Sequence, residues 1–136
     1  MKYLCIDFGL KHLGLAIADG PLAETFGEKK YDEESQALQF IARLCEEQAI
    51  NQIIFGLSEG KMAETTKTFV EKLKTLVNLP IFFQDESLSS VEAKQKLIAA
   101  HVPQFKRRRD HSAAAALILQ DYLDTIELNK GGKENV

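Results

Sequence analysis

Met1-Lys-Tyr-Leu-Cys-Ile-Asp7-Phe-Gly9 opens the chain as an apolar strand that ends in an aspartate and a glycine turn. A second apolar run, Leu13 to Ala18, follows the turn Gly9-Leu-Lys-His12, so the two runs predict an antiparallel hairpin. The stretch from Leu22 to Tyr31 has a weaker period of two and is predicted as a third strand.

Strands and helices then alternate. Apolar residues spaced by three and four predict helices, and short apolar runs predict strands. The predicted elements are helix Glu33–Gln48, strand Gln52–Leu57, helix Met62–Leu76, strand Pro80–Phe83, helix Ser89–Ala100 and helix Ser112–Glu127. This order predicts an α/β fold, a mixed sheet flanked by helices in a single domain over residues 1–128, with residues 129–136 as a flexible C-terminal tail. Ligands of such sheets collect beyond the carboxyl ends of the strands.

The composition is that of one globular domain. The chain has 136 residues, of which 45% are apolar and 27% charged. No apolar run approaches the ~20 residues that cross a bilayer, and the N-terminus is too soon charged for a secretory signal, so a soluble cytoplasmic protein without membrane contact is predicted. Cys5 and Cys45 fall in a strand and a helix pattern, which favours reduced, packed thiols over a disulfide or zinc site.

The net charge of −3 excludes a protein coated in positive charge for indiscriminate DNA binding. The cations are concentrated instead. Lys106-Arg107-Arg108-Arg109 directly precedes Asp110, and Lys11 lies in the turn after Asp7. We predict that these five residues contact nucleic-acid phosphates, although a charge run is also typical of a solvated loop.

Three acidic residues at element junctions carry the chemical argument. Asp7, Glu86 and Asp110 are delivered by separate parts of the chain, and carboxylate oxygens are the ligands that Mg²⁺ and Mn²⁺ prefer. Two such cations activate a water and shield the leaving oxygen of a phosphodiester. We therefore predict Asp7, Glu86 and Asp110 as catalytic metal ligands of a metal-dependent phosphodiester hydrolase, with Mg²⁺ or Mn²⁺ as cofactor.

Alternatives exist for each acid. Asp85 and Glu86 point to opposite faces of an extended chain, so only one enters the site, and Glu86 is preferred; Glu59 is a further candidate, or a solvated loop residue. Asp7 also suits the start of a turn, the Asp85-Glu86 pair suits a helix N-terminus, and Asp110 suits an N-cap. Weaker candidates are the hydroxyls of Ser87, Ser89 and Ser90 for phosphate, and His12 and His111 for proton transfer.

Four blocks of sequence, in order, resemble the YqgF (RuvX) family: Asp7-Phe-Gly-Leu-Lys-His-Leu-Gly-Leu-Ala-Ile-Ala-Asp19, Ile54-Phe-Gly-Leu57, Asp85-Glu-Ser-Leu-Ser-Ser-Val-Glu-Ala93 and Asp110-His-Ser-Ala-Ala-Ala-Ala-Leu-Ile-Leu-Gln-Asp-Tyr-Leu123. The resemblance implies a ribonuclease-H-like fold and a nuclease that resolves Holliday junctions or trims the 5′ end of precursor 16S ribosomal RNA. Its implied partners are precursor rRNA or branched DNA, and ribosomal particles. It also implies that Asp7, Glu86 and Asp110 are the matching acidic positions.

The chain departs from the family pattern at two places. Ser87 stands where the family usually has Arg after the Asp-Glu pair, and Ser58 stands where Pro follows the Gly-Leu of the middle strand, before a shortened loop. The phosphate contact of the missing Arg is either lost or supplied by residues 106–109.

Two other classes of function remain open. One is a catalytically silent nucleic-acid-binding module. The other, much less favoured, is an ATP-binding domain of the actin or sugar-kinase type, which needs two lobes where 136 residues give one. A resolvase would favour a homodimer, whereas an RNA trimmer can act as a monomer.

Overall fold

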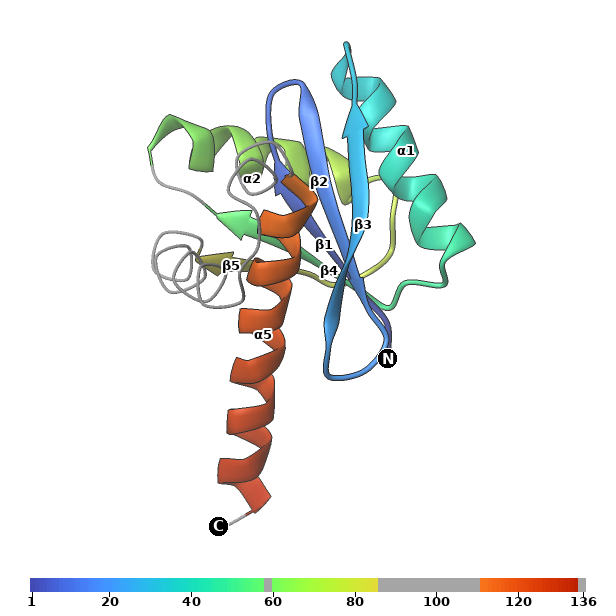
Figure 1. Ribbon diagram of the computed structural model, residues 1–136. Helices are drawn as coiled ribbons and strands as arrows, with labels where there is room; N and C mark the ends of the chain where they lie inside the picture. The colour runs from blue at the N-terminus through green and yellow to red at the C-terminus, as the bar shows by residue number, and fades with distance from the viewer. Residues whose placement is uncertain (58–59, 86–110, 135–136) are drawn as a thin grey trace.

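A twisted sheet with helices on both faces forms the centre of the molecule (Figure 1). The computed structural model describes residues 1–57, 60–85 and 111–134, and within them the strand order is β3-β2-β1-β4-β5. The elements are β1 (Tyr3–Phe8), β2 (His12–Ala18), β3 (Ala23–Lys30), α1 (Glu34–Glu47), β4 (Gln52–Leu57), α2 (Lys61–Leu73), β5 (Ile81–Asp85) and α5 (His111–Glu134). The α/β fold with one mixed sheet is confirmed.

The pairing of the strands brings three strand ends together. β2 is antiparallel to both β1 and β3, whereas β4 is parallel to β1 and to β5. The last residues of β1, β4 and β5 are Phe8, Leu57 and Asp85, and they lie on the same side of the sheet because the three strands run in the same direction. We call this side the carboxyl end of the sheet.

Side-chain alternation along β1 divides the core into two layers. Leu4, Ile6 and Phe8 belong to a cluster that includes buried side chains of α1 and α2, among them Ile41 and Phe69. Cys5 belongs to the cluster on the other face, whose helical members come from α5: Ala115, Ile118, Leu119 and Leu123. Each fully buried aliphatic or aromatic side chain contributes about 1.5–3 kcal/mol, so both faces of β1 fix its position firmly.

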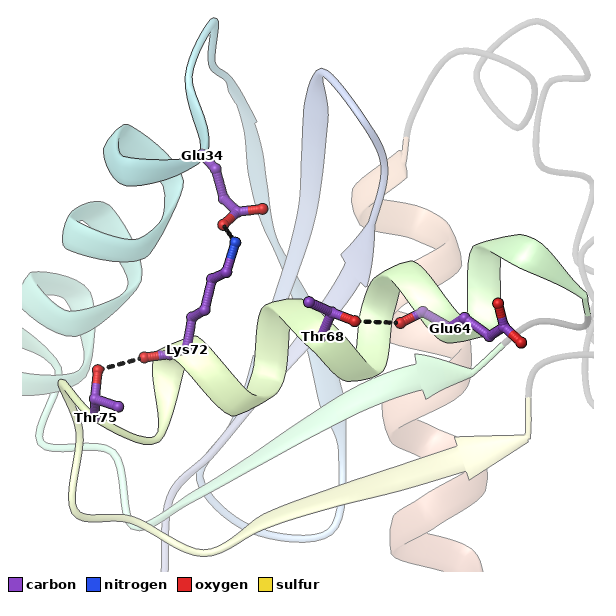
Figure 2. Close-up of polar contacts among 5 residues, drawn as sticks. All are labelled: Glu34, Glu64, Thr68, Lys72 and Thr75. Atoms are coloured by element: carbon purple, nitrogen blue, oxygen red, sulfur yellow. Dashed lines mark hydrogen bonds and ion pairs between the residues drawn. The ribbon is translucent and has the colours of Figure 1, made fainter.

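Helices α1 and α2 cover one face and are joined on the solvent side by an ion pair. The Lys72 ammonium of α2 lies 2.6 Å from the Glu34 carboxylate of α1 (Figure 2). Figure 2 also shows the Thr68 hydroxyl donating to the Glu64 carbonyl oxygen, and the Thr75 hydroxyl donating to that of Lys72. Both partners of the ion pair are roughly half exposed, so it contributes at most about 1 kcal/mol, and the apolar core holds the two helices in place.

Helix α5 covers the opposite face and begins at the carboxyl end of the sheet (Figure 1). Further along the helix, the Gln120 side chain accepts a hydrogen bond from the Ala23 N–H and donates one to the Pro21 carbonyl oxygen, which ties α5 to the far end of β3. The helix reaches Glu134, so the predicted helix end near Glu127 is wrong, and the backbone of residues 129–134 is helical.

Two other elements differ from simple expectation. Strand β3 is confirmed, but its register shifts against β2: Leu15 pairs with Gly27 and Ala16 with Thr25, so Phe26 is the extra residue of a bulge. Gly27 has a φ of 113°, a conformation that favours glycine. The predicted helix Ser89–Ala100 lies outside the described residues. No helix within the described ranges has the length and apolar character of a membrane-spanning segment.

Candidate active site at the carboxyl end of the sheet

Asp7 lies one residue before the end of the central strand β1 and is half-buried. Its alternation with Cys5 places it on the face of the sheet that α5 covers. On one side, its partner in β2 is Gly14. On the other side, Phe55 is the last β4 residue paired with β1, and Gly56 follows it. Because neither glycine carries a side chain, the strands beside Asp7 leave room around its carboxylate for a ligand.

The β1–β2 turn is held by backbone contacts close to Asp7. The Gly9 N–H donates to the His12 carbonyl oxygen at 2.9 Å, and a Cβ added to Gly9 would lie 3.0 Å from that same oxygen. Glycine at this position therefore accommodates the close approach of His12, which a larger residue would crowd. The Tyr31 hydroxyl, reaching in from beyond β3, donates a hydrogen bond to the Gly9 carbonyl oxygen, and the Tyr31 N–H donates to the carbonyl oxygen of Lys11.

Strand β5 contributes Gln84 to the same face as Asp7. Gln84 pairs with Gly56 of β4, and its side-chain amide donates to the Asp121 carboxylate of α5 at 2.5 Å. Two strand spacings of about 4.8 Å separate β5 from β1, so the backbones of Asp7 and Gln84 lie roughly 10 Å apart. This hydrogen bond fixes α5 against β5 where the two elements approach the carboxyl end.

The predicted site residues are placed as follows. Asp7 is at the carboxyl end, and Asp85 is the exposed last residue of β5. Lys11 is exposed in the β1–β2 turn and donates to the Asp32 carbonyl oxygen at 3.3 Å. His12 begins β2, and His111 begins α5. Outside the described residues are Glu59, Glu86, Ser87, Ser89, Ser90, Lys106, Arg107, Arg108, Arg109 and Asp110. Within the described part of the chain no group of three His, Cys, Asp or Glu side chains gathers as a metal site.

Two features near the site were missed from the sequence. Tyr31 was assigned only to a weak strand pattern, and its hydrogen bond to Gly9 depends on a contact across three strands. Lys29 and Lys30 directly precede Tyr31 at the end of β3. This adjacent pair of cations is the pattern in the sequence that could have indicated a phosphate-binding surface here.

The first 125 residues match a protein-family model described as "RuvX: Holliday junction resolvase". A protein of Chelativorans sp. (strain BNC1) is 38% identical over 134 residues, covering 90% of this chain and 82% of the relative. A protein of Streptococcus thermophilus (strain ATCC BAA-491 / LMD-9) is 35% identical over 138 residues, covering 93% and 99%. Both are named "Putative pre-16S rRNA nuclease".

Solved structures share the fold at low sequence identity. The Thermus thermophilus RuvC protein in complex with a Holliday junction substrate has a TM-score of 0.66 at 14% identity, covering 96% of each chain. The Fowlpox virus resolvase in complex with Holliday junction DNA has a TM-score of 0.55 at 15% identity, covering 93% of this chain and 99% of the other. These likenesses establish a resolvase-type, ribonuclease-H-like fold. The match over residues 1–125, with relatives 38% and 35% identical over most of the chain, shows that the chain belongs to the RuvX family.

Proposed function

We propose that this protein is a Mg²⁺- or Mn²⁺-dependent nuclease that trims the 5′ end of precursor 16S ribosomal RNA in the cytoplasm, on ribosomal particles. One observation supports it most. Asp7 lies at the carboxyl end of β1. At the same end of the sheet, β5 ends at Asp85, the residue before Glu86. Helix α5 also begins at this end, at His111, the residue after Asp110. The described elements that flank Glu86 and Asp110 in the sequence therefore end or begin at the same end of the sheet as Asp7, which supports the proposal.

The surroundings of Asp7 suit a hard divalent cation. Its half-buried carboxylate is an oxygen donor on a strand fixed by core packing on both faces, and Gly14 beside it leaves space for an ion and its waters. Bound at this point, the metal supplies an activated water and neutralises charge that develops on the phosphate. Thiolate and imidazole ligands, which would favour zinc, are not the predicted donors.

The parity of β5 favours Glu86 over Asp85 as the second acid. Gln84 shares the face of Asp7, as its bond to α5 shows. Because side chains alternate between the two faces of a strand, Asp85 belongs to the opposite face from Gln84. Glu86 is two residues after Gln84 in the sequence, the spacing that the alternation assigns to the face of Gln84. Asp7, Glu86 and Asp110 would hold the metal, and Lys11 with residues 106–109 would hold the substrate phosphates.

RNA is the preferred substrate because the relatives that match nearly the whole chain carry the name of a pre-16S rRNA nuclease. Branched DNA is the second candidate, favoured by the description of the matching family model. Hydrolysis of either backbone uses the same acids and ions. A homodimer would suit symmetric cleavage of a junction, whereas a monomer suffices for trimming RNA.

The test is digestion of precursor 16S rRNA and of a four-way DNA junction, side by side, with and without Mn²⁺, by the wild type and the Asp7→Asn variant. Amide and carboxylate have nearly the same shape, so we expect Asp7→Asn to fold normally and lose cleavage. Cleavage of precursor rRNA alone supports the trimming function, and cleavage of the junction alone supports the resolvase function. Full Mn²⁺-dependent activity in Asp7→Asn refutes the assignment of Asp7. Metal-independent binding without cleavage of either substrate indicates a silent binding module.

A further inference from the structure

A groove of about 400 Å³ lies where the end of β3 meets α1, on the face of the sheet opposite to the one that Asp7 shares with α5. Its rim carries three cations, Lys29 and Lys30 from β3 and Arg43 from α1, and one acid, Asp32. Tyr31 and Phe40 supply aromatic rings to its lining. None of these residues was assigned to the substrate by sequence reasoning.

Positive charge exceeds negative charge among the residues that line this groove. The chain as a whole has a net charge of −3, yet three cations face one carboxylate here. Lys72 and Lys74 form ion pairs with glutamates, whereas Lys29, Lys30 and Arg43 form none with any residue in the described ranges. Lys11, whose ammonium lies 3.3 Å from the Asp32 carbonyl oxygen, adds a fourth cation at the border. Such a surface attracts a polyanion.

The aromatic residues suit a particular kind of polyanion. The Lys29 ammonium lies 5.2 Å from the centroid of the Phe40 ring, so the ring supports the lysine without consuming its hydrogen-bond donors. Phe40 itself is only partly buried and packs on the core from α1. Cations beside aromatic faces are the combination that binds single-stranded nucleic acid, where phosphates meet the cations and sugars or bases meet the rings.

The groove adjoins the β1–β2 turn that follows Asp7. Tyr31 lines the groove and its hydroxyl contacts Gly9, two residues after Asp7. In the β3–β2 ladder Lys30 pairs with His12 and Lys29 with Leu13, next to the turn that follows β1. β3 lies two strand spacings from β1, roughly 10 Å. Asp7 faces α5 whereas the groove lies beside α1, so a nucleic-acid strand with its reacting phosphate at Asp7 reaches the groove by crossing over the β1–β2 turn.

We infer that this groove, defined by Lys29, Lys30, Arg43, Tyr31 and Phe40, binds the single-stranded RNA that flanks the cleavage site. The inference rests on the proposed nuclease function and adds a substrate-binding subsite to it. The cations hold the phosphates of the flank, and the partly exposed Phe40 ring favours an unpaired strand over a duplex. The enzyme thereby selects substrates that carry a single-stranded extension next to the bond that is cut.

The experiment compares Lys29→Gln/Arg43→Gln with the matched control Lys2→Gln/Lys74→Gln, which removes the same charge at the opposite end of the sheet. Binding of two labelled RNA hairpins, one with and one without a single-stranded flank, is measured in EDTA over a series of salt concentrations. For the flanked RNA, we expect the groove variant to bind about 10-fold more weakly at low salt. Its salt slope should fall by about 1.4, that is about 0.7 for each lost phosphate contact. The unflanked RNA should bind equally to all three proteins.

Each outcome bears on one proposal only. A groove variant with the slope and affinity of the control overturns the subsite, while wild-type cleavage by that variant leaves the nuclease function standing. Equal weakening for flanked and unflanked RNA also overturns it, because the charges then act as a general field. Weakened binding of duplex or branched DNA with unchanged RNA binding assigns the groove to DNA and overturns the RNA inference. Cleavage tests of Asp7→Asn address the nuclease function separately.

Discussion

The Tyr31 hydroxyl donates a hydrogen bond to the carbonyl oxygen of Gly9, and so connects the segment after β3 with the turn that follows Asp7. Tyr31 is 8% exposed, and its ring belongs to the core cluster on the α1 and α2 face. This one side chain therefore anchors the turn beside the candidate metal ligand, and it also lines the basic groove.

Replacing this hydroxyl tests the anchoring. Tyr31→Phe keeps the ring in the core and leaves the Gly9 carbonyl oxygen without its donor, so we expect a loss of about 1 kcal/mol in the free energy of unfolding and a lower cleavage rate. Urea unfolding and nuclease assays measure the two effects. Tyr122→Phe is the control, because the Tyr122 hydroxyl has no hydrogen-bond partner within the described ranges. Equal stability changes in both variants would contradict the anchoring role.

The same residue predicts a dependence of stability on pH. Burial, and secondarily the nearby Glu34 carboxylate, raise the pKa of Tyr31 above its ordinary value of 10.0. The folded state therefore holds this proton more tightly than the unfolded state. The resulting stabilisation is complete below pH 10 and is lost as the pH rises from there through the raised pKa. Urea midpoints between pH 9 and 11 should fall more steeply for the wild type than for Tyr31→Phe; parallel curves would rule out this contribution.

The contact between Gln84 and Asp121 predicts how α5 is held on β5. Gln84→Leu removes the donor and leaves a partly buried carboxylate without it, so we expect a loss of about 1–2 kcal/mol in unfolding free energy. Asp121→Asn keeps an acceptor oxygen at the same place and should cost less. Chemical denaturation of both variants checks this order. An unchanged stability in Gln84→Leu would show that packing alone positions the helix.

The burial of Cys5 and Cys45 predicts that their thiols react slowly with reagents in the native protein. Neither forms a disulfide and both are buried, and burial raises the pKa of Cys45 from 9.0 to about 11. At pH 8 the reactive thiolate fraction is then about 100-fold lower than for an ordinary thiol. We expect the native protein to react with a disulfide reagent far more slowly than the urea-unfolded protein, and Cys45→Ala to remove one of the two groups that react after unfolding. Rapid labelling of Cys45 in the native state would contradict its burial.

The sequence by itself determined most of the described elements and the place of Asp7. Periods of two and 3.6 residues report which side of each segment is buried, so the hairpin, strand β4 and helix α1 were predicted nearly as they occur. An acid between Ile6 and Phe8 at the end of an apolar strand was enough to place Asp7 at the carboxyl end. Glu86 and Asp110 as its partners remain predictions.

Only the tertiary structure decided which distant residues meet. The bond from Tyr31 to Gly9, and that from Gln84 to Asp121, depend on strand order and on where a helix lies across the sheet, which local periodicity does not encode. The same holds for the groove, because Lys29 and Arg43 come from a strand and a helix that meet only after packing. The bulge at Phe26 likewise arises from the register between two strands. Patterns along the chain specify burial, whereas neighbours in space are fixed by the cooperative packing of both faces of the sheet.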